Sequence, residues 1–116
     1  MASTPKKIKI GPQTWGVVER ERASDGLLDE GSYGYTLPNA NLIVLDANIP
    51  HSKKRSVMLH EILHAVRLQY DPTQKPSREA DLDEWEHFFI GVWDNGLLGV
   101  LRDNPRLVEW LVEADK

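Results

Sequence analysis

Apolar and polar residues alternate in short stretches near the start of the chain. Residues 6–10 have a period of two, Gly11 and Pro12 interrupt it, and residues 14–18 are again rich in apolar side chains. Because Pro12 cannot donate a ladder hydrogen bond and Gly11 permits a bend, the pattern predicts a strand, a break and a second strand. Residues 19–34 are polar with three glycines, so we expect an exposed connection whose charges are solvated.

A hairpin is predicted next. Residues 33–37 and 42–45 have strand-like composition, and residues 38–41 between them read Pro-Asn-Ala-Asn, which favours a turn.

A helical pattern follows at residues 57–66. At about 100° per residue the apolar side chains gather on one side, which predicts a helix with a buried back and an open front. These residues are Met58, Leu59, Ile62, Ala65 and Val66.

The bounds of this helix follow from its flanking residues. It is expected to begin after Ser52 or at Lys53, or later with Ser56 as its cap. It should end near Tyr70, because Asp71 and Pro72 form a stop signal.

Three cations precede the apolar run, namely Lys53, Lys54 and Arg55. In a first turn they oppose the helix dipole, so we expect a solvated face. Attraction of an acidic substrate is the alternative interpretation.

Two more helices are predicted in the C-terminal part. Large apolar residues recur at spacings of three and four between residues 82 and 101. They are Leu82, Trp85, Phe89, Val92, Trp93, Leu97 and Val100. Asn104 as cap and Pro105 at the first helical position then start a last helix, whose apolar face contains Leu107 and Trp110. The predicted fold class is therefore α+β: a small antiparallel sheet from the first 46 residues, then three helices.

Length and composition restrict the possible domain organisation, cellular compartment and partners. With 116 residues the chain is long enough for one core, so residues 1–116 are expected to be a single domain. The absence of cysteine excludes disulfides and thiolate ligands and is compatible with a reducing cytosol. The N-terminus has no apolar run typical of a signal peptide or anchor, so a cytoplasmic protein without a membrane partner is expected. A net charge of −4 argues against a nucleic-acid partner.

The predicted helix at residues 57–66 contains the sequence His60-Glu61-Ile62-Leu63-His64, which matches the H-E-x-x-H pattern of zinc hydrolases. One helical turn apart, His60 and His64 can point at one ion. Glu61 is turned aside by one position, which suits a general base that reaches the water on the metal. The alternative is that the histidines are only hydrogen-bonded side chains near a core.

Residues 42–46 and 57–65 together resemble the small gluzincin-like metallopeptidases, most of all compact phage and mobile-element proteins related to the ImmA/IrrE group. Residues 96–105 resemble the helix end that follows the third zinc ligand in those proteins. The resemblance covers about half of the chain. It implies a minimal zincin-like fold and a zinc peptidase whose substrates are regulatory proteins in the host cytosol. It also implies that the strand before the metal helix lies at the sheet edge and pairs with the substrate. For residues 42–46, the alternative interpretation is an ordinary central strand.

A third protein ligand is needed to leave one zinc position for water. With Phe89 placed at 0° around the helix axis, Glu86 falls at about 60°, which is inside the apolar stripe. A carboxylate at such a position is unfavourable unless it is paired or binds an ion. Glu86 is therefore the first choice, Glu79 the second, and His87, Glu84 or no protein ligand remain open.

The resemblance points to the same region, because counting back from Gly96 leads close to Glu86. Thermolysin-like gluzincins carry an acidic residue four positions after this ligand, where this chain has Ile90. The group that holds a ligand histidine must then come from elsewhere in the chain.

The leading hypothesis is a zinc metallopeptidase with His60, His64 and Glu86 as zinc ligands and Glu61 as general base. Its partner would be a peptide or protein substrate. Four residues are candidates for stabilising the oxyanion: Tyr33, Tyr35, Tyr70 and His87. The second hypothesis is a zinc-stabilised phage regulatory or interaction protein with little proteolytic activity, and a third reading treats the motif as accidental.

Overall fold

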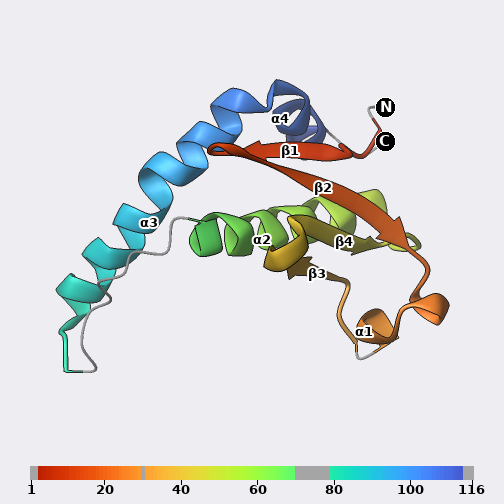
Figure 1. Ribbon diagram of the computed structural model, residues 1–116, viewed down its shortest axis with the longest axis horizontal. Coiled ribbons are helices and arrows are strands. Elements are labelled where there is room, and N and C mark those ends of the chain that lie inside the picture. Colours follow the sequence, from red (N-terminus) through yellow and green to blue (C-terminus); the bar gives the residue numbers. More distant parts are fainter. Residues whose placement is uncertain (1–2, 30, 70–78, 114–116) are drawn as a thin grey trace.

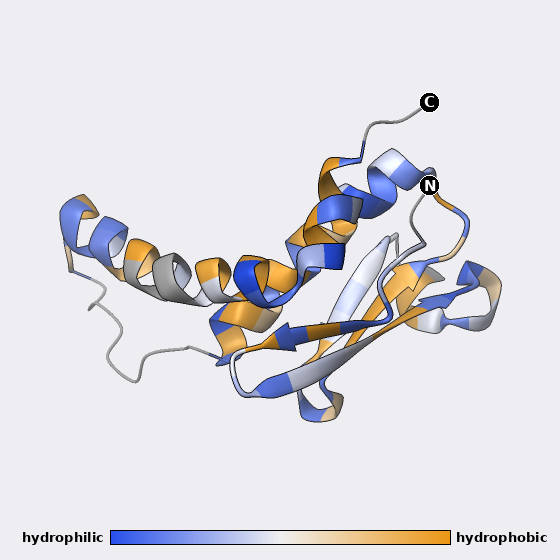
Figure 2. Ribbon diagram, turned by 90° about the horizontal axis from the view of Figure 1, so that it is seen from above, coloured by the Kyte–Doolittle hydropathy of each residue, from blue (hydrophilic) through white to orange (hydrophobic). Residues whose placement is uncertain are grey.

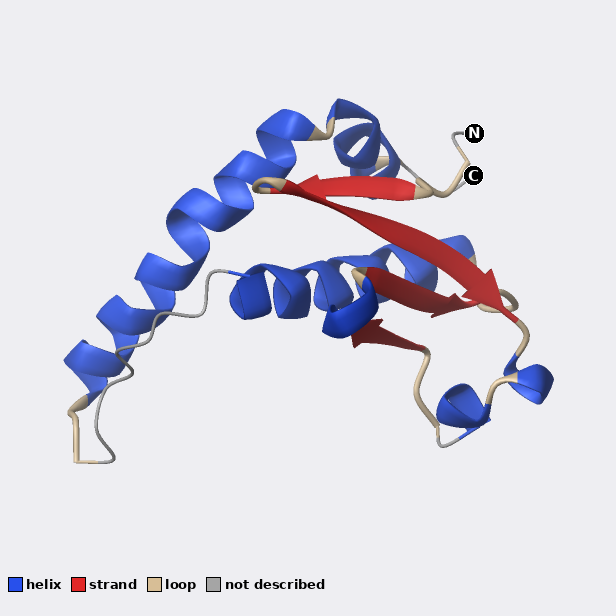
Figure 3. Ribbon diagram, viewed as in Figure 1, coloured by secondary structure: helices blue, strands red, loops and turns tan. Residues whose placement is uncertain are grey.

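A computed structural model describes residues 3–29, 31–69 and 79–113 (Figure 1). Four strands form one sheet: β1 (Lys7–Ile10), β2 (Gln13–Arg20), β3 (Gly34–Leu37) and β4 (Leu42–Asp46). Their order in the sheet is β1-β2-β4-β3. The chain therefore has the predicted α+β class, with helices gathered beside a small sheet (Figure 3).

The sheet is mixed, which corrects the expected antiparallel arrangement. The pairs β1–β2 and β3–β4 are antiparallel, but β2 and β4 run parallel with Gly16 opposite Leu42. The physical reason is the connection after β2, which takes the chain past the position of β4 before β3 forms. The hairpin then returns β4 into the gap beside β2.

The predicted β3–β4 hairpin is confirmed. A 3-10 turn, η2 (Pro38–Ala40), joins the strands, and Asn41 has the left-handed φ of 48° that asparagine tolerates better than most residues. Residues Ile43 to Asp46 of β4 are all buried, so β4 is a central strand. The edge strand on this side of the sheet is β3.

Helix α2 (His51–Gln69) packs on β3 and β4 through Met58, Ile62, Ala65 and Val66, which are buried. It begins at His51, earlier than expected, because the Pro50 carbonyl already accepts a hydrogen bond from the Lys54 backbone. It extends to Gln69, and the predicted end near Tyr70 lies outside the described residues. Leu59 was expected on the buried side but is 39% exposed.

Two of the three cations in the first turns of α2 are buried, so the expected solvated face is wrong for them. The Lys54 Nζ lies 2.5 Å from a Glu19 carboxylate oxygen. The Arg55 Nε donates to the Trp110 carbonyl at 3.0 Å. Lys53 is exposed as predicted, with its ammonium over the Tyr33 ring. Because Glu19 and Trp110 are distant in sequence, a local pattern could not identify these partners.

The connection between β2 and β3 is more ordered than its composition predicts. It contains η1 (Arg22–Ser24) and α1 (Gly26–Asp29), and Leu28 within it is fully buried. The Arg22 guanidinium donates to Asp46 Oδ2 at 3.0 Å and to two carbonyls of the connection. The Tyr35 hydroxyl donates to Asp25 at 2.5 Å. These contacts attach the connection to β3 and β4.

Both carboxyl groups in these contacts are stabilised in their ionised form. The hydrogen bond from Tyr35 lowers the pKa of Asp25, with further donors on the backbone and Arg20. The backbone N–H of Asn48, together with Arg22, lowers the pKa of Asp46. Burial raises the pKa of the Tyr35 hydroxyl, and its bond to Asp25 adds to the effect.

Helix α4 (Pro105–Val112) buries Leu107 and Trp110 against the core, as its pattern predicts. Asn104 precedes it at the cap position, but its side chain makes no cap bond. Instead it accepts from the Lys9 backbone N–H and donates to the Lys9 carbonyl, each at 2.8 Å. Asn104 therefore covers the free edge of β1.

Helix α3 (Leu82–Asp103) is one continuous helix, capped by Asp81, whose side chain accepts from the Glu84 N–H. It contacts α2, β1 and α4, and its N-terminal half extends away from the sheet (Figure 1). Hydrophobic residues continue into the extended half (Figure 2). The predicted stripe is therefore only partly a core face: Val100 is buried and Trp93 packs against the core, but Phe89 is 47% exposed. Helical spacing identified the face correctly and could not identify what covers it.

Among the described helices, none combines the length and the hydropathy required to cross a bilayer.

Candidate functional site: a histidine pair on α2

Two histidines face one another on the exposed side of α2. The Nε2 atoms of His60 and His64 are 3.1 Å apart, and their ring centroids are separated by 4.7 Å. Both residues are exposed, whereas their helix neighbours Ile62 and Ala65 are buried. The amphipathic packing of α2 on the sheet therefore turns the two imidazoles toward solvent.

The separation of the two nitrogens suits one metal ion. Two zinc–nitrogen bonds of about 2.0–2.1 Å at a tetrahedral angle place the nitrogens roughly 3.3 Å apart. The distance of 3.1 Å between the His60 and His64 Nε2 atoms is close to this value without any change of backbone. Neutral imidazoles are common zinc ligands, so these two residues fit the ion that the sequence predicts.

Glu61 lies on the other side of the same turn and is only 6% exposed. Its Oε1 accepts a hydrogen bond from the Thr36 hydroxyl at 2.7 Å, and its backbone carbonyl lies 3.2 Å from the same hydroxyl. A hydrogen bond from a hydroxyl to one carboxylate oxygen fixes the orientation of the carboxylate. Thr36 therefore positions Glu61.

The contact between Thr36 and Glu61 depends on a close approach of β3 to α2. A Cβ built on Gly34 would lie 2.7 Å from a Val57 methyl group and 2.9 Å from the Val44 carbonyl oxygen. Glycine is therefore required where β3 passes under the helix. Since side chains alternate along a strand, Gly34 and Thr36 share the face toward α2.

Thr36 was not among the residues singled out from the sequence. A signal was available: residues i and i+2 of the predicted strand place Gly34 and Thr36 on one face, and a hydroxyl next to a glycine suits close packing on a helix. What the sequence could not supply is that this face meets Glu61, because 25 residues separate the two side chains along the chain.

The structure does not bring Glu86 to the histidine pair. Glu86 is exposed on α3, in the face that also contains Phe89 and Trp93. Within residues 3–29, 31–69 and 79–113, no group of three His, Cys, Asp or Glu side chains is arranged to hold a metal ion. The expectation that Glu86 lies on a core-facing side is wrong, because that half of α3 extends away from the sheet.

The other candidates for a third ligand are on the same segment. Glu79 is exposed before α3 begins, and Glu84 is exposed in its first turn. His87 is also exposed, with its Nδ1 3.7 Å from an Asp83 carboxylate oxygen. His60 and His64 thus come together, Glu61 lies on the other side of the same turn, and the third ligand stays a prediction.

The candidates for oxyanion stabilisation also lie in different parts of the chain. Tyr35 lies on the strand next to Thr36, and its hydroxyl binds Asp25. The Tyr33 ring contacts the Lys53 ammonium at 3.7 Å and lies 5.1 Å from the Arg22 guanidinium carbon. His87 is on α3, and Tyr70 lies outside the described residues.

Comparison of the chain with protein-family models, with curated proteins and with solved structures gives no match.

Proposed function

We propose that this chain is a zinc-dependent hydrolase that cleaves peptide bonds, with a minimal zincin-like arrangement of helix and edge strand. One observation carries the proposal: the Nε2 atoms of His60 and His64 converge to 3.1 Å one helical turn apart, in the turn that also contains the buried Glu61. Residues i and i+4 of any helix share one face, so the support beyond the motif itself is that this pair is exposed to solvent while the carboxylate in the same turn is held by a hydroxyl.

His60 and His64 would hold a zinc ion through their Nε2 atoms. The ion, when bound, lowers the pKa of water toward neutrality and polarises a carbonyl. Glu61 accepts the proton of the attacking water and passes it to the leaving amine. Thr36 keeps the Glu61 carboxylate in one orientation through its 2.7 Å hydrogen bond, which limits the motion of the base.

The edge strand β3 is the proposed place for the substrate backbone. It pairs with β4 on one side only, and Thr36 in it contacts the general base. An extended peptide can add to such an edge through main-chain hydrogen bonds. The role that the resemblance assigned to residues 42–46 thus passes to β3, because β4 is central.

Glu86 remains the first proposal for the third ligand, followed by Glu79, His87 and Glu84. Glu84, Glu86 and His87 lie in the N-terminal half of α3, which extends from the body of the molecule, and Glu79 precedes the helix. A zinc ligand from this half requires it to approach α2 more closely. Glu86→Gln beside Glu84→Gln tests this choice, since only the ligand's substitution lowers zinc affinity.

Peptide hydrolysis is tested with the variant Glu61→Gln. The amide keeps the size of the carboxylate and an oxygen that can accept from Thr36, but it is not a base at neutral pH. We expect cleavage of unstructured protein substrates by the zinc-loaded wild type, and a loss of at least 100-fold in kcat for the variant with zinc retained. Equal cleavage by Glu61→Gln would exclude Glu61 as the base.

A second candidate function is a zinc-stabilised interaction protein of the phage regulatory type. The observation that favours it is the exposed apolar face of α3, together with the absence of an assembled third ligand among the described residues. In that case zinc raises the stability of α2, and Glu61→Gln leaves function unchanged.

A further inference from the structure

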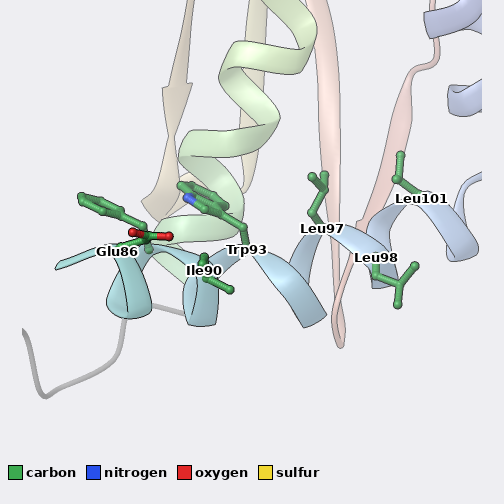
Figure 4. Close-up of a pocket in the computed structure, with 7 residues that line it drawn as sticks. Glu86, Ile90, Trp93, Leu97, Leu98 and Leu101 are labelled. Atoms are coloured by element: carbon green, nitrogen blue, oxygen red, sulfur yellow. The ribbon is translucent and has the colours of Figure 1, made fainter. Parts of the chain in front are cut away.

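A pocket lies at the end of the sheet where β3 ends and where β2 and β4 begin. Three parts of the chain line it: the start of β2 with the turn before it, η2 with the following Asn41, and the last turn of α2. The groove along α3 is different, because that helix alone lines it (Figure 4). The pocket has a volume of about 510 Å³, which is in the range of small-molecule sites and is large enough to admit a side chain.

The pocket continues the strip between α2 and the edge strand β3. Within this strip the Thr36 hydroxyl contacts the Glu61 carboxylate. Further along both elements, Pro38 and Leu68 line the same pocket. Since β3 and α2 advance along the strip in the same direction, the pocket lies where both of them end.

Leu68 lies on the same flank of α2 as the histidine pair. It follows His64 by four residues, which corresponds to about 40° around the helix axis and about 6 Å along it. An extended peptide covers this distance with roughly two residues. A peptide that adds to β3 with its scissile bond at the histidines therefore brings a side chain about two residues away to the pocket.

The lining of the pocket is polar but uncharged. Of the described residues that line it, none is an acid or a base. The Trp15 Nε1 donates to Gln69 Oε1 at 3.3 Å, and Gln69 Nε2 donates to the Ile10 carbonyl at 2.9 Å, so this wall is fixed. On the opposite side, Asn41 Nδ2 donates to Gln13 Oε1 at 3.1 Å.

One donor and one acceptor are left over from the last contact. Within the described part of the chain, the Gln13 Nε2 and the Asn41 Oδ1 have no hydrogen-bond partner. Turning both amides over exchanges their roles and leaves the same pair. A primary amide matches this pair because it both donates and accepts, whereas a carboxylate only accepts and an ammonium only donates. A charged group would also lose its hydration without gaining a counter-charge.

We propose that this pocket selects a glutamine side chain of the peptide substrate, about two residues from the scissile bond. The inference rests on the proposed hydrolysis of peptides at the histidine pair. The substrate amide bonds to Gln13 and Asn41, and its two methylene groups pack on Pro38 and Leu68. Gln13 and Asn41 are thus specificity-determining residues for the proposed reaction.

Binding of short blocked peptides in the presence of a chelator tests this selection. The ¹H–¹⁵N NMR spectrum of the full chain shows the side-chain amides of Gln13 and Asn41 and the indole N–H of Trp15 directly. A peptide that contains glutamine should shift these three signals to saturation. The amide of Asn48, which follows β4 at the other end of the sheet, should not shift. Peptides with glutamate, lysine or leucine in place of glutamine should bind at least about tenfold more weakly.

The variant Gln13→Glu tests the role of the lining. Its carboxylate brings a negative charge and only acceptors, so the preference should move from the glutamine peptide to the lysine peptide. Thr14→Glu is the matched control, because side chains alternate along β2 and Thr14 lies on the opposite face from Gln13. It should keep the preference of the wild type.

Three results would overturn the proposal: no shift of the pocket signals with any peptide, equal or tighter binding of the glutamate or leucine peptide, or an unchanged preference in Gln13→Glu. Neither zinc nor cleavage enters this measurement. Selection of glutamine by a protein that lacks peptidase activity would refute the proposed function alone, whereas cleavage of peptides without this selection would refute the pocket alone.

Discussion

Replacing Thr36 with valine removes the hydroxyl that holds the Glu61 carboxylate. Valine has nearly the same shape, so packing between β3 and α2 is kept. The Thr36 hydroxyl donates to Glu61 Oε1 at 2.7 Å, and Glu61 is buried. A hydrogen bond to a charged group contributes about 1.5–3 kcal/mol, so the free energy of unfolding should fall by about this amount.

Urea denaturation followed by tryptophan fluorescence measures this loss. For a chain of this size each kcal/mol corresponds to roughly 3–6 °C in Tm, so we expect Tm to decrease by about 5–15 °C. Thr36→Ser keeps the hydroxyl and should recover most of the stability.

Thr14→Val makes the same change at an exposed position of β2, where the expected effect lies within about 0.5 kcal/mol. A Thr36→Val variant as stable as the wild type, or an equal loss in Thr14→Val, would contradict this role of the Thr36 hydroxyl. Either result would mean that Thr36 does not stabilise the Glu61 carboxylate.

Two further predictions concern packing and pH. Gly34→Val should lower the free energy of unfolding by about 1–3 kcal/mol or more in urea titrations, because its Cβ would meet Val57 and the Val44 carbonyl, whereas Gly26→Ala meets no atom within 4 Å and should change stability far less. Because the folded pKa of Asp25 and of Asp46 lies below the unfolded value of about 3.9, their stabilisation is fully present above that pH and is lost as pH falls toward the folded pKa. Asp46→Asn should therefore flatten the decrease of stability between about pH 5 and pH 2, and an unchanged slope would contradict this origin.

The histidine site was predictable to the extent that helix geometry determines it. Residues i and i+4 of any helix lie on one face, so His60 and His64 had to meet once α2 formed. The contact of Thr36 with Glu61, and the position of any third ligand, depend on how other elements approach α2. The spacing of residues along the sequence does not contain that information. The same distinction explains the β3–β4 hairpin, which is local, and the parallel β2–β4 pair, which is not.

Several predictions of exposure or burial were wrong for a related reason. Lysine and arginine side chains are usually solvated, but the Glu19 carboxylate binds Lys54 and the Trp110 carbonyl accepts a hydrogen bond from Arg55. Asn104 occupies the predicted cap position, yet its amide binds the edge of β1 because the backbone of Lys9 lies within reach. The apolar face of α3 was assigned to the core, but only part of it packs there: Val100 is buried and Trp93 contacts the core, whereas Phe89 is 47% exposed.

The central claim is that His60 and His64 form a zinc site, and the most direct test is the zinc content of the purified protein by elemental analysis. We expect about one zinc per chain in the wild type and in His51→Ala, an exposed histidine at the start of the same helix. His60→Ala and His64→Ala should each lose most of the metal. No zinc in the wild type after incubation with excess metal, or equal content in all four proteins, would contradict the account.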